Sequence, residues 1–179
     1  MRILSFIPWL LFALTSFAHA QQSPTCALLT ASDIEVATGV KPGTPQPGEM
    51  KMPAGKGIGE TTVYTCFWLV AGQTAAQSGQ IVASTARIPT GMDVKAVVRN
   101  NPGIDALRAQ RYTAEDKDFG NTSCTVLTPP AGAKDGMMMS SCSTAAKGTL
   151  LSIVHMSPTR KLTMDQTKKL FDKAVARLR

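Results

Sequence analysis

Residues 123–142 read Ser-Cys-Thr-Val-Leu-Thr-Pro-Pro-Ala-Gly-Ala-Lys-Asp-Gly-Met-Met-Met-Ser-Ser-Cys. Both ends of this stretch have the composition of β-strands, and residues 129–135 between them are turn formers. The stretch therefore predicts a β-hairpin. If Pro130 pairs with Gly136, Cys124 lies directly opposite Cys142, where two cysteines are within reach of a disulfide bond.

The chain has four cysteines, which in a small exported domain predict two disulfides, although four thiols permit three pairings. If Cys124 bonds to Cys142, Cys26 and Cys66 remain as the second pair. The sequence contains neither a C-x-x-C motif nor a cluster of cysteine and histidine. A redox motif and a zinc site are therefore not expected.

Three further strands are expected outside the hairpin. Residues 61–70 alternate in the strand pattern and are largely apolar on both faces, which is typical of a central strand. Residues 80–89 and 149–156 also have the pattern of strands. The connections between strands are too short for parallel crossovers, so the sheet is expected to be antiparallel.

A helix is expected within residues 26–39. It begins at Thr30 or Ser32, since Ser32 and Glu35 have the spacing of a capping box, and Gly39 suits its end. The residues on its inner stripe are Ala27, Ala31, Ile34 and Thr38.

The carboxy-terminal helix is expected to begin after Thr163, because Thr163 and Gln166 form a capping-box pattern. Its inner face holds Thr167, Leu170, Phe171, Ala174 and Leu178. Residues 90–99 and 104–107 predict shorter helical segments. The fold class is therefore α+β, with an antiparallel sheet of about five strands, helices packed on one face, and two disulfides. Residues 40–60, rich in proline and glycine, are expected to be a long flexible loop.

The amino terminus has the three parts of a secretory signal peptide. Arg2 is followed by an apolar run over residues 3–17 and by the small-x-small cleavage site of residues 18–20. The apolar run is shorter than the roughly 20 residues that span a bilayer, so no transmembrane segment is expected after cleavage. No cysteine follows the cleavage site directly, which argues against a lipid anchor. Residues 1–20 are thus a predicted leader, and residues 21–179 are a single periplasmic or secreted domain.

The chain has 19 Lys and Arg against 12 Asp and Glu, a formal net charge of +7. The basic residues are spread along the chain and concentrate only near the carboxy terminus, so nucleic-acid binding is not favoured. A candidate partner is an anionic envelope component or an acidic protein. It would contact Lys168, Lys169, Lys173 and Arg177.

Catalytic patterns are sparse. His155 is the one histidine that remains after cleavage, and no G-x-S-x-G nucleophile motif occurs. His155 is therefore expected to have a structural role. The carboxylates of Glu115, Asp116 and Asp118 have the chemistry that glycoside hydrolysis requires, but they are expected to solvate a loop. The sequence favours a non-enzymatic domain without a cofactor, and hydrolysis is the more distant of two alternatives.

The nearer alternative is binding of Cu(I), for which thioether sulfur is a suitable soft ligand. The candidate ligands are Met50, Met52, His155 and Met156. Methionine is also an adaptable filler of apolar cores, and structural packing is the favoured interpretation.

The run Cys-Ala-Leu-Leu-Thr-Ala-Ser-Asp-Ile-Glu-Val-Ala-Thr-Gly at residues 26–39 is followed by a loop and then by Tyr-Thr-Cys-Phe-Trp at residues 64–68. Together they resemble the opening of a group of bacterial exported proteins and lipoproteins of unknown function. In that group a C-x-L-(L/I)-T-x-x-(D/E) helix precedes a cysteine-bearing strand. The resemblance implies a disulfide between Cys26 and Cys66 and supplies no enzymatic role. The sequence therefore predicts a non-enzymatic exported envelope protein, an accessory binding or interaction module.

Overall fold

The computed structural model describes residues 23–52, 60–70, 79–88, 93, 98, 102–133 and 136–178. These residues form one antiparallel sheet of seven strands in the order β1-β2-β3-β7-β6-β5-β4. The prediction of an antiparallel sheet is confirmed, whereas the estimate of about five strands is too low. The predicted leader and most of the helix expected over residues 90–99 lie outside the described residues.

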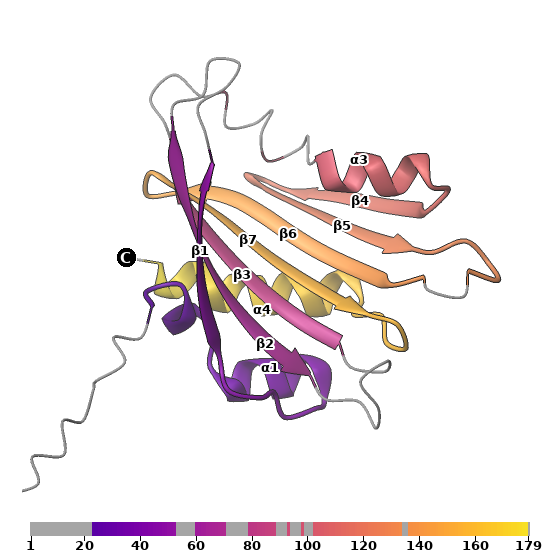
Figure 1. Cartoon of the computed structure of the whole chain (residues 1–179), viewed down its shortest axis with the longest axis horizontal. Helices are drawn as coiled ribbons and strands as arrows, with labels where there is room; N and C mark the ends of the chain where they lie inside the picture. Colours follow the sequence, from indigo (N-terminus) through magenta and orange to yellow (C-terminus); the bar gives the residue numbers. More distant parts are fainter. Residues whose placement is uncertain are drawn as a thin grey trace, which may run out of the picture.

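The sheet consists of two antiparallel meanders that lie side by side (Figure 1). The first contains β1 (Gln46–Met52), β2 (Thr61–Val70) and β3 (Gly79–Arg87). The second contains β4 (Thr113–Phe119), β5 (Thr122–Thr128), β6 (Met138–Ala146) and β7 (Thr149–Ser157). β3 pairs with β7 and thereby joins the two meanders.

The two strands that the sequence does not predict, β1 and β4, are the edges of the sheet. β1 falls in the expected loop over residues 40–60, and β4 carries the acidic residues expected to solvate a loop. An edge strand has one neighbour and solvent on its other side, so proline, lysine and other charged residues are tolerated there. Both edges therefore lack the apolar alternation that identifies the five central strands.

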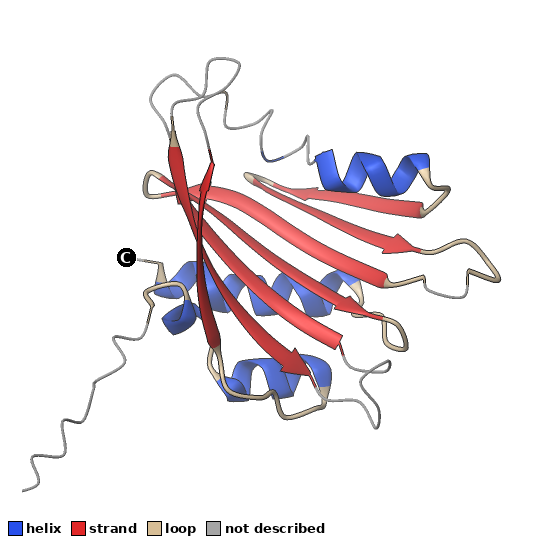
Figure 2. Cartoon of the chain, viewed as in Figure 1, coloured by secondary structure: helices blue, strands red, loops and turns tan. Residues whose placement is uncertain are grey.

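Helices lie on both faces of the sheet (Figure 2). On one face, α4 (Met164–Arg177) packs on β5, β6 and β7 and contacts α1 (Ala31–Thr38) and the short helix η1 (Cys26–Leu28). On the other face, α3 (Pro102–Ala109) lies beside β4. The prediction that helices pack on one face is therefore wrong for α3, because the pattern of a short segment shows its apolar side but not which face of the sheet buries it.

The helix α1 begins one position after Thr30, whose hydroxyl accepts a hydrogen bond from the backbone N–H of Asp33. The carboxylate of Asp33 in turn accepts from the backbone N–H of Thr30. Thr30 is thus the confirmed cap, and the alternative box of Ser32 and Glu35 is wrong. Gly39 ends the helix in the left-handed conformation, with φ of 68°. Of the expected inner stripe, Ile34 and Thr38 are buried, whereas Ala27 and Ala31 are exposed.

The helix α4 has the capping box that the sequence predicts, formed by Thr163 and Gln166. All five residues of its predicted inner face are buried, namely Thr167, Leu170, Phe171, Ala174 and Leu178. Its apolar stripe therefore supplies much of the cover over the sheet. None of the described helices has the length and apolar character that crossing a bilayer requires.

Both predicted disulfides are present, and both lie in the core that α4 covers. Cys26 bonds to Cys66, and Cys124 bonds to Cys142, which lies opposite it in the register of β5 and β6. The strand pairing places one cross-strand row on this face. Its members are Cys66, Ala83, Ile153, Cys142 and Cys124.

Gly79, the first residue of β3, leaves room for the adjacent strand β7. A Cβ atom at this position would lie 2.9 Å from the carbonyl oxygen of Met156 and 3.1 Å from Cβ of Ser157. We expect Gly79→Ala to lower the free energy of unfolding by about 2 kcal/mol, because over-packing forces the backbone apart. Urea denaturation of both proteins measures the difference.

Gly43→Ala is the matched control for this experiment. A Cβ atom on Gly43 would meet its nearest neighbour, the carbonyl oxygen of Leu69, at an ordinary 3.6 Å. We expect a change within about 0.5 kcal/mol. Equal stability of the two variants would contradict the steric explanation.

Candidate binding surface

A row of five hydroxyl groups crosses the face of the sheet opposite to α4. The strand register pairs Thr65 with Ser84, and Ser84 with Ser152. It continues from Ser152 to Ser143 and from Ser143 to Ser123. Directly paired residues share a face, so the five side chains point the same way from five adjacent strands. We call Thr65, Ser84, Ser152, Ser143 and Ser123 the hydroxyl row.

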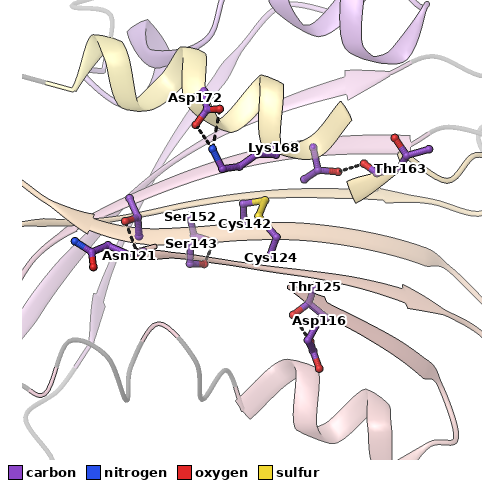
Figure 3. The surroundings of a disulfide bond; sticks show 12 residues. Asp116, Asn121, Cys124, Thr125, Cys142, Ser143, Ser152, Thr163, Lys168 and Asp172 are labelled. Atoms are coloured by element: carbon purple, nitrogen blue, oxygen red, sulfur yellow. Dashed lines mark hydrogen bonds and ion pairs between the residues drawn. A yellow bond between two sulfur atoms is a disulfide. The ribbon is translucent and has the colours of Figure 1, made fainter. Parts of the chain in front are cut away.

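Figure 3 shows how the two faces differ around the second disulfide. The bond between Cys124 and Cys142 points towards α4, whereas Ser143 and Ser152 extend from the opposite side of the same sheet. The hydroxyl of Ser143 donates a hydrogen bond to that of Ser152 over 3.0 Å. Because successive side chains of a strand point to opposite faces, each of these strands contributes alternate residues to the core and to the face of the hydroxyl row.

The hydroxyl row runs through directly paired positions of five adjacent strands. Neighbouring strands of a sheet lie about 4.8 Å apart, so the row spans about 19 Å. All five of its side chains are half-buried. At its β1 end lies Gly48, where a Cβ atom would come within 2.6 Å of the hydroxyl oxygen of Thr65. The absence of a side chain at Gly48 thus leaves the hydroxyl of Thr65 unobstructed.

Apolar side chains flank the hydroxyl row on this face. On one side the register aligns Phe67, Val82 and Val154, and on the other it aligns Val63, Ala86 and Leu150. Phe67 is 37% exposed. The described residues that β1, β2, β3, β5, β6 and β7 contribute to this face include no charged side chain. The surface therefore combines uncharged hydrogen-bonding groups with apolar borders.

Among the described strands, β4 alone contributes acidic side chains to this face. Asp118 pairs with Ser123 at the end of the hydroxyl row, and Asp116 pairs with Thr125. Asp116 accepts hydrogen bonds from the hydroxyl of Thr125 over 2.7 Å and from Arg108 of α3. Glu115 lies on the other face. Of the three carboxylates behind the hydrolase alternative, Asp116 and Asp118 thus share this face, whereas Glu115 is separated from them by the sheet.

The structure does not bring the proposed Cu(I) ligands together. His155 faces the core, opposite Ser140, whereas Met156 lies on the face of the hydroxyl row, opposite Gln80 and Met139. Met50 lies on the edge strand β1, three strands from β7. The side chain of Met52 lies outside the described residues. Within the described ranges, no group of three His, Cys, Asp or Glu side chains is arranged to hold a metal ion.

The side chain of His155, which the sequence predicts to be structural, is 2% exposed. Burial lowers the pKa of its imidazole to about 4, with a contribution from the positive charge of Arg160. Among the described residues, neither its Nδ1 atom nor the hydroxyl of the opposing Ser140 has a hydrogen-bond partner. His155 is therefore a neutral core residue, as its expected structural role requires.

The basic residues of α4 are partly neutralised by carboxylates. The Nζ atom of Lys168 bonds to both carboxylate oxygens of Asp172, at 2.6 and 2.8 Å. Arg177 pairs with Asp33 and also donates to the carbonyl oxygen of Leu28. Burial alone would raise the pKa of Asp33, but hydrogen bonds from Arg177 and Thr30 lower it to about 2.

Lys169 and Lys173 line a groove between α1 and α4, together with Asp33 and Asp172. The groove therefore contains both signs of charge and is not a uniformly basic surface. Binding of an anionic partner by α4 stays a prediction.

A second groove lies where η1 meets the end of α4. It has a volume of about 800 Å³ and presents the side chains of Thr25, Thr85, Thr149, Lys147 and Arg177. Thr25 and Thr85 share a hydrogen bond of 2.7 Å, and the Nζ atom of Lys147 donates to the carbonyl oxygen of Leu178. Sequence analysis cannot detect this groove, because its lining comes from segments far apart in the chain.

No protein-family model and no curated protein matches the chain. Its structure is similar to the crystal structure of the extracellular domain of PknH from Mycobacterium tuberculosis, with a TM-score of 0.55 and 14% sequence identity. The match covers 87% of this chain and 94% of that one. At this identity it establishes the fold alone. The expectation of an exported, non-enzymatic domain and the resemblance to bacterial envelope proteins stay predictions.

Proposed function

We propose that the chain is a non-enzymatic, exported binding module of the bacterial envelope, and that its ligand lies along the hydroxyl row. The single observation that carries the proposal is the row itself, five hydroxyls from five strands on the face opposite to α1 and α4, where α3 lies only beside the edge strand β4 among the described helices. A folded domain gains no core packing from such a row. Its position on a rigid sheet suits a site that must present polar groups at fixed spacing.

The chemistry of this surface favours an uncharged, hydroxyl-rich ligand. Each serine or threonine hydroxyl donates one hydrogen bond and accepts others, as sugar hydroxyls do. Beside the row, the exposed Phe67 and the half-buried Val154 offer an apolar border to the apolar faces of sugar rings. Among the described strands, charged side chains on this face are confined to β4, so the strands offer no counter-ion for an anionic polymer along most of the row.

The spacing of the hydroxyl row further favours an extended polymer. Polar groups that repeat about every 4.8 Å over about 19 Å match a chain that lies across the strands, and not a compact metabolite. We therefore propose a segment of neutral glycan as the ligand. Two buried disulfides and the extracellular neighbour support an exported location, where such polymers are found.

Titration followed by NMR tests this function. Protein purified after export and labelled with ¹⁵N is mixed separately with cellohexaose, chitohexaose and maltohexaose, and with oligogalacturonate as an anionic comparison. We expect at least one uncharged oligosaccharide to shift the backbone amides of Ser84, Ser143 and Ser152. The amides of α4 should not shift.

Two matched variants locate the site. Ser84→Lys places a long charged side chain in the middle of the hydroxyl row and should weaken binding at least tenfold. Ser32→Lys makes the same change on the exposed surface of α1 and should leave the affinity unchanged. If none of the uncharged oligosaccharides shifts these amides, or if Ser84→Lys binds as well as the unaltered protein, the proposed ligand class is wrong.

A further inference from the structure

The exposed apolar side chains of the described chain gather at one edge of the sheet. Five large apolar residues are exposed, namely Val36, Met50, Tyr64, Phe67 and Leu69. All except Val36 lie on β1 or its neighbour β2. Met50 and Leu69 are 57% and 53% exposed. Met50, Phe67 and Leu69 share one face of the sheet, whereas Tyr64 lies on the other, and an exposed apolar patch marks an interaction surface.

The edge strand β1 contains one acidic and one basic residue, Glu49 and Lys51, two positions apart. Glu49 and Lys51 are both exposed and lie on the same face of the strand, with Met50 between them on the other face. β1 pairs with β2 on one side and ends the sheet on the other. An edge strand presents backbone N–H and C=O groups that can pair with another strand.

We propose that β1 pairs with β1 of a second copy of this chain, antiparallel and about a twofold axis at Met50. In this register Glu49 lies opposite the partner's Lys51, and Lys51 lies opposite the partner's Glu49. Met50 lies opposite the partner's Met50, so that two exposed apolar side chains cover each other. Oppositely charged pairs directly across a sheet stabilise it. The two sheets thereby become one continuous sheet.

The charges select this register over its neighbours. Moving the pairing by two residues in one direction places Glu49 opposite the partner's Glu49. Moving it by two residues in the other direction places Lys51 opposite the partner's Lys51. Like charges directly opposite one another destabilise a strand pair. A shift by a single residue would place the core face of one sheet beside the hydroxyl-row face of the other, so the two cores would lie on opposite sides.

The other edge of the sheet lacks this complementarity. β4 carries the acidic Glu115, Asp116 and Asp118 against the single basic Lys117. The self-pairing that would match Glu115 with the partner's Lys117 would also place Asp116 opposite the partner's Asp116. Arg108 of α3 additionally holds Asp116. Edge β4 is therefore protected by charge, whereas edge β1 is neutral over residues 46–52 and complementary to itself.

Charge reversal tests the dimer. We expect sedimentation of the purified, exported protein over a concentration series to show a species of twice the monomer mass. Glu49→Lys alone and Lys51→Glu alone should each weaken self-association at least tenfold, since each places like charges opposite one another twice. An equimolar mixture of the two variants should dimerise as the unaltered protein does. In the mixed dimer, positions 49 and 51 are both basic in one copy and both acidic in the other, so opposite charges face each other again.

Glu115→Lys, the same reversal on β4, is the control and should not alter self-association. Circular dichroism establishes that each variant is folded, and the mixture provides a readout that loss of fold could not imitate. The proposal is overturned by a protein that remains monomeric throughout the series. It is equally overturned if the single variants dimerise as well as the unaltered chain, or if their mixture does not associate.

Discussion

Replacing Cys26 and Cys66 together by alanine should lower the free energy of unfolding by about 4 kcal/mol, the loop-closure entropy of a disulfide that spans 40 residues. Without the disulfide, the unfolded chain gains conformations that it does not have when cross-linked. In the folded protein, Cys26 lies in η1, a helix of only three residues that the disulfide attaches to the central strand β2. Guanidinium denaturation of the oxidised protein and of the double variant measures the difference.

The second disulfide provides the comparison. Cys124 and Cys142 close a loop of only 18 residues, and their double replacement should cost about 3 kcal/mol. Both pairs are buried, so the loss of packing is similar in the two variants. A larger loss for the Cys124 and Cys142 variant than for the Cys26 and Cys66 variant would contradict the explanation by loop length.

Acidification from pH 7 to pH 4 should destabilise the protein by about 3 kcal/mol through His155. The pKa of His155 is lowered from its ordinary 6.5 to about 4 in the folded protein, first by burial and then by Arg160. The unfolded chain binds a proton as the pH falls below 6.5, whereas the folded chain does not until about pH 4. The folded state is therefore at full stability above pH 6.5 and loses it between these two values.

His155→Leu should remove this pH dependence, because the side chain no longer titrates. Asp33 titrates in a separate range, since its pKa is lowered from 3.8 to about 2, and its contribution is lost only as the pH falls below about 4. Asp33→Asn thus serves as a control that should leave the decline between pH 6.5 and 4 unchanged. If His155→Leu declines as steeply as the unaltered protein in that range, another group is responsible.

The five central strands could be predicted from the sequence because burial on at least one face leaves a pattern in each of them. Residues 61–70 coincide with β2, and the hairpin register correctly places Cys124 opposite Cys142. The edge strands β1 and β4 could not be recognised, since solvent on one side permits Pro47, Lys51 and the carboxylates of β4. Apolar alternation in a sequence records burial, and the edge strands lack that alternation because they are less buried.

The hydroxyl row could not be predicted for a different reason. Ser84 of β3 and Ser152 of β7 are neighbours only because strands far apart in the chain pair, and no local pattern determines that pairing or its register. Within one strand, a serine between apolar residues is common. Conversely, the methionine and histidine residues that are adjacent in sequence, His155 and Met156, point to opposite faces of the sheet.

The linkage of the cysteines has a consequence for how the molecule is made. Each disulfide joins consecutive cysteines. The first attaches η1 to the meander of β1, β2 and β3, the second lies within the other meander, and neither crosses the junction of β3 and β7. A chain that enters an oxidising compartment amino terminus first presents Cys26 and Cys66 before Cys124 has emerged. The native linkage is therefore also the one favoured by the order of arrival. The last elements to emerge, β7 and α4, then join the two cross-linked halves.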